Sequence, residues 1–258
     1  MPSPRLQIYA LSGIPIIKSG DDLAQVIVAA LGANDLSLEP EDVLVVTSKI
    51  VSKAENRFVD LRTITPSARA REVAVVTQKD PRLVELILRE AHSISRMKAG
   101  TLITRHRLGF VSANSAIDQS NVEGSDEWAL LLPEYPDASA RRLRQGIAAL
   151  TGIAPAIVIS DTHGRPFRLG NVGVAIGAAG LPALLNLRGT PDLFSRRLQH
   201  TDIGLADELA SAADLVSGQA AEGLPVTLIR GLKLPSNAPQ DGKASDLYRP
   251  PEMDLYRE

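Results

Sequence analysis

Runs of apolar, β-branched residues mark the expected strands of this chain. The clearest run is Val43–Thr47, which predicts a buried strand. Ala156–Ser160 has the same character and predicts a second buried strand. Less regular runs predict further strands over residues 5–11, 72–77, 172–176 and 226–229, and two short strands within 101–112.

Helical periodicity and helix-start signals lie between these runs. Acidic residues open a helix over 21–31, and Asp80 with Pro81 opens another that runs through Ala91. Further helices are expected over 139–151, where Gly152 supplies the stop, over 202–213 and in part of 66–79. Strands and helices do not alternate regularly enough for a doubly wound sheet, so we predict an α+β fold.

The end of the chain has a different composition. From Leu234 onward Pro, Asn, Gln, Asp, Gly and Ser dominate, and Pro250-Pro251 cannot continue a helix. We therefore divide the chain into a globular part, residues 1–233, and a weakly structured Pro-rich tail, residues 234–258. The tail is expected to be dispensable for both stability and function.

Composition limits the possible functions. The chain has 258 residues, of which 44% are hydrophobic, enough for a substantial core. A net charge of −2 and only 3% aromatic residues disfavour binding to nucleic acid or to an anionic membrane. The absence of cysteine excludes disulfides, thiol catalysis and thiolate zinc sites, and it is compatible with a cytoplasmic location. No signal-peptide pattern is expected at the start, and the apolar stretch Val172–Leu185 is too short to cross a bilayer.

Ser48, Lys49 and Lys53 follow the strand expected at Val43–Thr47. A buried strand that leads into Ser-Lys-x-x-Ser-Lys would make a good phosphate clamp. The alternative is a solvated pair of lysines with Glu55 as a local partner. These residues alone give the two interpretations equal weight. The chain contains no Gly-x-x-x-x-Gly-Lys-Ser/Thr, which excludes a P-loop.

Two aspartates come directly after apolar runs. Asp118 stands among Asn and Ser residues that also suit a plain Asx-rich turn, and Asp161 also suits a helix N-cap. Taken together, two carboxylates at strand ends indicate an oxygen-ligated divalent cation. Of the four histidines, only His163 is close enough to Asp161 in the sequence to approach such a site.

Two glycine-rich stretches have plain structural interpretations. Gly170, Gly173, Gly177 and Gly180 do not form Gly-x-Gly-x-x-Gly, and their spacing indicates close packing or turns. The stretch 217–231 is, by itself, an ordinary loop between a helix and a strand.

Five segments in this order resemble the coenzyme F420-0:L-glutamate ligase family, also called F420:gamma-glutamyl ligases. They are Gly-Ile-Pro-Ile-Ile-Lys at 13–18, Ser-Lys-Ile-Val-Ser-Lys-Ala-Glu at 48–55, Asn-Ser-Ala-Ile-Asp-Gln-Ser-Asn at 114–121, Ile-Ser-Asp-Thr at 159–162 and Ser-Gly-Gln-Ala-Ala-Glu-Gly at 217–223. The resemblance covers about residues 13–231. It implies an uncommon mixed-sheet α+β fold that forms an intertwined homodimer. It also implies GTP-dependent addition of one or more γ-linked L-glutamates to the deazaflavin precursor F420-0, with GDP and phosphate as products.

The resemblance also implies roles for particular residues. Contacts to GTP are implied for Ile14, Pro15, Ile16, Ile17, Ser48, Lys49, Lys53 and Asn121, and for the segment Ser217, Gly218, Gln219, Ala220, Ala221, Glu222, Gly223 and Leu224. Divalent-metal ligands are implied at Asp118, Asp161, Thr162 and Gln219. These oxygen donors favour Mg²⁺ or Mn²⁺, with K⁺ as a further candidate. Asp118, Asp161 and Lys53 would support the chemistry, through an acyl phosphate formed on F420-0.

Two alternatives stay open at this point. One is an ATP- or GTP-dependent amino-acid ligase that acts on another acidic acceptor. The other is a protein that binds nucleotide or F420 without turnover. The tail also resembles the start of a linker to the flavin-binding domain that some bacterial relatives carry.

Overall fold

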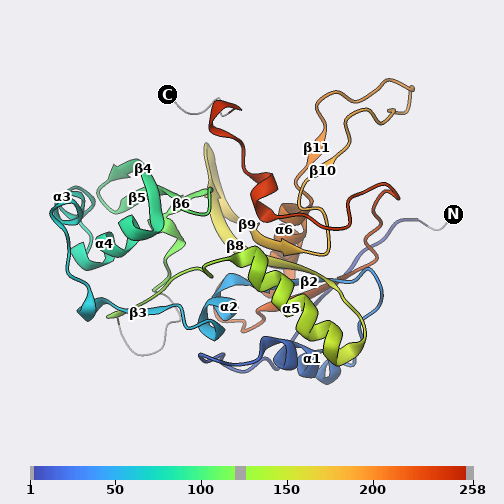
Figure 1. Cartoon of the computed structure of the whole chain (residues 1–258), viewed down its shortest axis with the longest axis horizontal. Coiled ribbons are helices and arrows are strands. Elements are labelled where there is room, and N and C mark those ends of the chain that lie inside the picture. Colours follow the sequence, from blue (N-terminus) through green and yellow to red (C-terminus); the bar gives the residue numbers. More distant parts are fainter. Residues whose placement is uncertain (1–2, 120–125, 254–258) are drawn as a thin grey trace.

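A five-stranded mixed sheet forms the centre of the larger part of the molecule (Figure 1), in a computed structural model that describes residues 3–119 and 126–253. The strand order is β1-β12-β2-β8-β9, in which β2 and β8 pair in parallel and the other neighbours pair antiparallel. The strands are β1 (Gln7–Ala10), β2 (Val43–Thr47), β8 (Ala156–Arg165), β9 (Arg168–Ala179) and β12 (Val226–Arg230). This mixed sheet, together with its helices, confirms the predicted α+β class.

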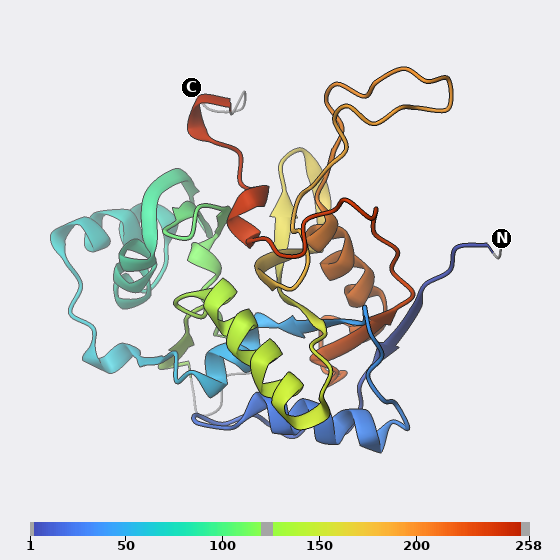
Figure 2. The same ribbon diagram turned by 45° about the vertical axis from the view of Figure 1, so that its right-hand side comes forward.

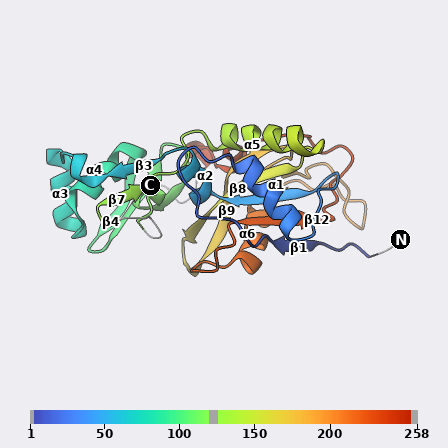
Figure 3. The same ribbon diagram turned by 90° about the horizontal axis from the view of Figure 1, so that it is seen from below.

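Helices cover both faces of this sheet (Figure 3). α1 and α5 pack on one face, against Leu44 and Val46 of β2, whereas α6 packs on the other, against Val43 and Val45. Because both sets of side chains are buried, β2 appears in the sequence as one unbroken apolar run. Each of these side chains contributes about 1.5–3 kcal/mol on burial. The helices are α1 (Leu23–Ala33), α5 (Pro136–Thr151) and α6 (Leu205–Ser217).

Glycines in β9 let these helices approach the sheet closely. A Cβ added at Gly173 would lie 2.5 Å from the carbonyl oxygen of Ala210 in α6. A Cβ added at Gly177 would lie 2.6 Å from the carbonyl carbon of Pro136 in α5. The prediction that these glycines serve close packing is confirmed.

A smaller lobe lies beside the main sheet (Figure 1), and a hairpin projects from another side (Figure 2). The lobe contains two helices and the three-stranded sheet β4-β5-β6, and the strand pair β3–β7 lies next to it. Its elements are β3 (Phe58–Asp60), η1 (Leu61–Thr63), α3 (Ala68–Thr77), α4 (Pro81–Glu90), β4 (Ala91–Lys98), β5 (Thr101–His106), β6 (Val111–Ala113), η2 (Asn114–Ala116) and β7 (Trp128–Leu130). The projecting hairpin begins with β10 (Leu185–Asn186) and ends with β11 (Asp202–Ile203).

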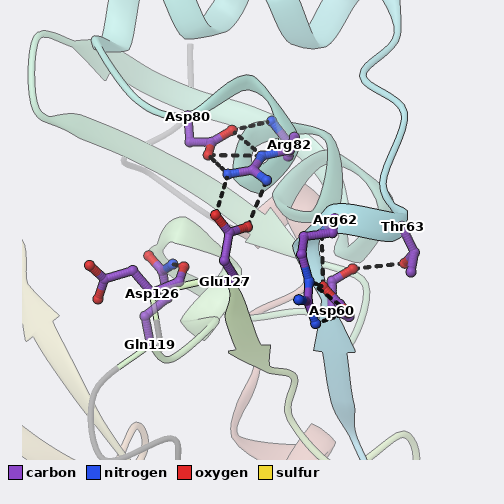
Figure 4. Close-up of polar contacts among 8 residues, drawn as sticks. All are labelled: Asp60, Arg62, Thr63, Asp80, Arg82, Gln119, Asp126 and Glu127. Atoms are coloured by element: carbon purple, nitrogen blue, oxygen red, sulfur yellow. Dashed lines mark hydrogen bonds and ion pairs between the residues drawn. The ribbon is translucent and has the colours of Figure 1, made fainter. Parts of the chain in front are cut away.

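Arg82 ties the start of α4 to the segment before β7 (Figure 4). Its guanidinium bonds to Asp80 at 2.6 Å and to Glu127 at 2.7 Å. Close by, Gln119 Nε2 donates to the carbonyl oxygen of Asp126 at 3.3 Å. The Arg82 contacts connect the start of α4 to the residue before β7.

The strongest sequence patterns predicted their elements correctly. β2 spans Val43–Thr47 as expected, and Asp80 caps α4 by accepting the backbone N–H of Arg82 at 2.8 Å. Gly152 ends α5 with a φ of 76°, a conformation that favours glycine.

Residues 72–77 do not form the strand that their β-branched residues predicted. They belong to α3, which Ser67 caps by accepting the backbone N–H of Ala70 at 3.1 Å. The buried residues lie at 70, 73, 74 and 77, which is the spacing of one helical face, while Val75 is 79% exposed. Burial on that face therefore outweighs the β propensity of the valines.

Two other boundaries differ from the prediction. Residues 202 and 203 pair with β10, so α6 begins only at Leu205. β8 continues from Ser160 to Arg165 because β9 keeps pairing with it beyond the end of β2. The apolar stretch that begins at Val172 lies mostly in β9. No helix in the described parts of the chain is long and apolar enough to span a bilayer.

The tail packs against the sheet and its helices. Ala244 is 1% exposed, Leu247 packs with the core beside α6, and Tyr248 packs with the core on the other face. Asp241 accepts the backbone N–H of Gly180 at 2.7 Å. The expectation of a weakly structured tail is therefore wrong for this part, whereas the division of the chain at residue 233 stays a prediction. The tail also contains two short 3₁₀ turns, η3 (Ala244–Leu247) and η4 (Pro251–Met253).

Candidate active site

A cavity of about 1550 Å³ opens at the carboxyl ends of β2 and β8. Such strand ends are the usual place for ligands in sheets with parallel strands. The volume exceeds the roughly 300–1000 Å³ of a typical small-molecule pocket, so it has room for more than one ligand. Every described residue with a predicted binding role lines it, and Asn121 lies outside the described residues. The lining residues with predicted roles are Ile14, Pro15, Ile16, Ile17, Ser48, Lys49, Lys53, Asp118, Asp161, Thr162, Ser217, Gly218, Gln219, Ala220, Ala221, Glu222, Gly223 and Leu224.

The helix α2 (Ser48–Ala54) begins where β2 ends and brings its lysines to this cavity. Lys49 and Lys53 are four residues apart and therefore project from the same side of α2. Lys49 Nζ lies 2.5 Å from Asp118 Oδ2, and Ser48 Oγ lies 3.5 Å from Asp161 Oδ1. Two consecutive residues of α2 thus contact the two aspartates, which are far apart in the sequence.

A strained turn positions Asp118. The three residues of η2 have φ angles of 52–53°, in the left-handed region, which costs about 1–2 kcal/mol for each non-glycine residue. The Ser115 hydroxyl lies 2.8 Å from the Thr104 hydroxyl, and this hydrogen bond holds the turn in place. Asp118 then exchanges two backbone hydrogen bonds with Leu130, at 3.0 and 2.8 Å. The turn predicted from the Asn and Ser residues is present, and it places Asp118 on the cavity wall.

Asp161 lies inside β8, not at the helix N-cap that its sequence position also suited. The pairing of β8 with β2 ends at Ser160, and the register with β9 shifts between Ile159 and Ser160. Such irregularities re-aim side chains and are common beside functional sites. The His163 ring contacts the carboxylate, with Nε2 3.0 Å from Asp161 Oδ2, and packs against Phe110 with ring centroids 4.8 Å apart. His163 therefore approaches the site, as predicted, and its ring, packed on Phe110, orients the Asp161 carboxylate.

Thr162 and Gln219 meet beside a carboxylate that the sequence did not single out. Thr162 Oγ1 donates to Gln219 Oε1 at 2.9 Å. Burial raises the pKa of Asp214 in α6, and the negative charge of Asp161 raises it further, against the opposing effect of a hydrogen bond with Gln219. Asp214 lies in the last turn of α6, where an acidic residue is usually solvated, so no local signal indicated that it would line this cavity.

Two loops, at residues 14–17 and 217–224, complete the cavity wall. In the first loop Ile17 is 3% exposed and belongs to the core, whereas Ile16 is 72% exposed and available to a ligand. In the other loop Glu222 accepts the backbone N–H of Ala220 at 2.8 Å and folds back over Gly218. Gly218 has a φ of 72° and a ψ of 179°, a backbone conformation that favours glycine.

The donor set fits a hard divalent cation. The carboxylate of Asp161, the hydroxyl of Thr162 and the amide oxygen of Gln219 line the same cavity, and oxygen donors of this kind suit Mg²⁺ or Mn²⁺. The ammonium group of Lys49 at Asp118 indicates that this position also favours positive charge. Within residues 3–119 and 126–253, no three His, Cys, Asp or Glu side chains are placed to hold a metal, so hydroxyl and amide oxygens have to contribute. Lysines beside hard oxygen donors define a site suited to nucleotide and divalent-cation chemistry.

Known proteins resemble this chain over nearly its whole length. The family described as F420-0:Gamma-glutamyl ligase matches residues 13–231. Coenzyme F420:L-glutamate ligase of Methanothermobacter thermautotrophicus is 43% identical over 252 residues, which cover 98% of this chain and 99% of that protein. The protein of the same name from Methanopyrus kandleri is 46% identical over 256 residues, or 98% of each chain. The chain therefore belongs to the F420-0:gamma-glutamyl ligase family, as its five motifs predicted.

Proposed function

We propose that this protein ligates L-glutamate to F420-0 with GTP, through γ-linkage and one or more times. The observation that carries the proposal is that motif residues from separate parts of the chain line one cavity. Membership of the family and the names of its relatives supply the substrates.

The first step transfers the γ-phosphoryl group of GTP to the carboxylate of F420-0. A carboxylate oxygen attacks the γ-phosphorus, the bond to the bridging oxygen breaks, and GDP leaves with that electron pair. The product is an acyl phosphate. Lys49 and Lys53 line the cavity where they can neutralise phosphate charge. Such transfer depends on positioning and charge neutralisation more than on a covalent nucleophile.

The second step forms the amide bond. The neutral amine of glutamate attacks the acyl carbon, the carbon–oxygen bond to phosphate breaks, and phosphate leaves while the amine loses a proton. The exposed Ile16 and the 217–224 loop would enclose the nucleotide and limit attack by water on the acyl phosphate.

Asp118, Asp161, Thr162 and Gln219 would hold Mg²⁺ or Mn²⁺ in this reaction. When bound, such a cation supplies neutralisation of the charge on the transferring phosphoryl group. His163 would keep the Asp161 carboxylate oriented toward the cavity, since its Nε2 lies 3.0 Å from that group.

We also propose that the working form is a homodimer. Leu193 and Phe194 on the projecting β10–β11 hairpin are 98% and 83% exposed, and exposed apolar side chains of this kind favour association. Sedimentation velocity at micromolar concentration tests this, and a monomer throughout would contradict it.

The test of the reaction is direct. Purified protein, F420-0, L-glutamate, GTP and Mn²⁺ should give products heavier by whole glutamyl units in a mass spectrum. A chelator should stop the reaction, and added Mn²⁺ should restore it.

The matched variants are Asp161→Asn and Asp35→Asn. Both changes are nearly isosteric, but Asp35 is exposed and does not line the cavity. Asp161→Asn should abolish ligation with little change in the thermal midpoint, and Asp118→Asn should behave in the same way. Asp35→Asn should leave the rate unchanged. Full turnover by Asp161→Asn would remove Asp161 from the metal site.

A further inference from the structure

Three arginines line the cavity. Arg96 belongs to β4, Arg165 to the end of β8, and Arg168 to the start of β9. None of the three forms an ion pair with a residue that the structure describes. Lys49, by contrast, is paired with Asp118 in the same cavity.

The geometry of the β8–β9 hairpin concentrates this charge. Arg165 and Arg168 are opposite each other in the antiparallel register, where two like charges repel. Arg165 Nε is also buried without a hydrogen-bond partner, and its Nη2 reaches only the carbonyl oxygen of Leu169, at 3.3 Å. An oxyanion between the guanidinium groups would remove the repulsion and satisfy the buried nitrogen.

Apolar side chains stand beside the arginines. Ile103 pairs with Arg96 across β4 and β5, and it lines the cavity together with Val111 of β6. Leu169 at the hairpin is 99% exposed although it borders the same cavity. This wall therefore combines fixed positive charge with apolar surface, which suits a ligand that has anionic groups on an apolar body.

We propose that Arg96, Arg165 and Arg168 bind the anionic groups of the acidic acceptor, with Ile103, Val111 and Leu169 against its apolar part. The nucleotide and the cation would occupy the wall formed by α2 and the 217–224 loop, so the acceptor carboxylate would lie between the two walls. This inference rests on the proposed function, since it names the subsite of one of its substrates.

The test measures binding of F420-0 by calorimetry, in the absence of glutamate and turnover. Arg96→Gln and Arg168→Gln are the main variants, because both side chains are exposed and their removal disturbs no packing. Arg165 also borders a second hollow with Asp207 and Glu208, so Arg165→Lys serves as the milder third variant. Arg141→Gln is the matched control, since Arg141 is exposed and does not line the cavity.

Each main variant should weaken F420-0 binding about tenfold, as expected for the loss of a charge-assisted contact. Affinity for GTP and the KM for glutamate should change less than about twofold, as should all three quantities in Arg141→Gln. Unchanged F420-0 binding in both main variants would overturn the subsite. An increase confined to the KM for glutamate would overturn it too, because the arginines would then hold the incoming amino acid.

The outcomes for the subsite and for the reaction are distinguishable. If the unaltered protein binds F420-0, the variants bind it weakly, and no glutamate is added with GTP, then the subsite stands and the proposed reaction fails. If ligation proceeds and the variants bind F420-0 normally, the reaction stands and the subsite fails.

Discussion

Asp118 and Asp161 each contact a residue at the start of α2. Lys49 reaches one carboxylate at 2.5 Å, and the neighbouring Ser48 lies 3.5 Å from the other. The first contact is a close ion pair, whereas the second is at the outer limit of a hydrogen bond. Asp161 therefore depends more on His163, at 3.0 Å, than on Ser48 for its orientation.

Lys53 has an electrostatic role in the proposed reaction. If it neutralises phosphate, Lys53→Met should weaken GTP binding by roughly ten- to a hundredfold, from the loss of about 1.5–3 kcal/mol. Calorimetry with GTP and Mn²⁺ measures this, and Lys79→Met, remote from the cavity, is the control. Equal GTP affinity in Lys53→Met and the unaltered protein would show that Lys53 does not neutralise the phosphates.

Asp207 predicts a dependence of stability on pH. Burial raises its pKa, against the backbone N–H of Ala175, which donates at 2.8 Å, and the nearby His163. With a folded-state pKa above the unfolded one, ionisation favours the unfolded chain, so Asp207 destabilises the fold above the raised pKa. This destabilisation disappears below the unfolded value of about 3.9.

Asp207→Asn keeps an acceptor for Ala175 and removes the charge. Its thermal midpoint should exceed that of the unaltered protein at pH 7–8, and the difference should shrink as the pH falls toward about 4. Thermal unfolding followed by circular dichroism across this range measures the effect. A variant that is less stable at pH 7 would contradict the assigned sign.

The helices α5 and α6 approach strand β9 closely at Gly177 and Gly173, respectively. Gly177→Ala would force its Cβ to 2.6 Å from the Pro136 backbone, which cannot move as a flexible side chain can. We expect a loss of about 1–3 kcal/mol in unfolding free energy, the usual effect of overpacking. Chemical denaturation measures this loss.

The control for that change is Gly32→Ala. Gly32 lies in α1 with no atom within 4 Å of an added Cβ, so alanine should be neutral or stabilising by up to about 1 kcal/mol. Equal destabilisation by both variants would show that packing of β9 is not the cause.

At the scale of the whole molecule, the tail links elements that are far apart in the chain. Asp137 at the start of α5 accepts the backbone N–H of Ala178 at 2.9 Å and that of Ala244 at 3.0 Å. Tyr248 stacks edge-on with Phe110, whose ring contacts His163. The tail therefore supports the layer directly behind Asp161.

Removal of residues 240–258 tests this support. Composition predicted no effect, but loss of the packed Leu247 and Tyr248 should lower the thermal midpoint by about 5 °C or more. Ligation should fall as well, because Phe110 loses its contact with Tyr248 and no longer holds the His163 ring in place. The single change Tyr248→Ala should reproduce part of both losses. A truncated protein with unchanged midpoint and rate would support a separable tail.

Local interactions allowed much of this protein to be predicted from the sequence by itself. The unbroken apolar run of β2, the capping Asp80 of α4 and the terminal Gly152 of α5 each depend on neighbours within a few residues. The five motifs likewise indicated the family, because each is a contiguous segment.

Contacts between distant residues were decided only by the tertiary structure. Residues 72–77 became helical because their buried positions face one side, and β8 passed beyond Ser160 because β9 continued to pair with it. Asp214 and the cavity arginines carry no local signal, since a charged residue in a helix or hairpin is usually solvated. Their meeting in one cavity depends on how sheet, lobe and loops pack, and nearest-neighbour patterns do not encode that packing.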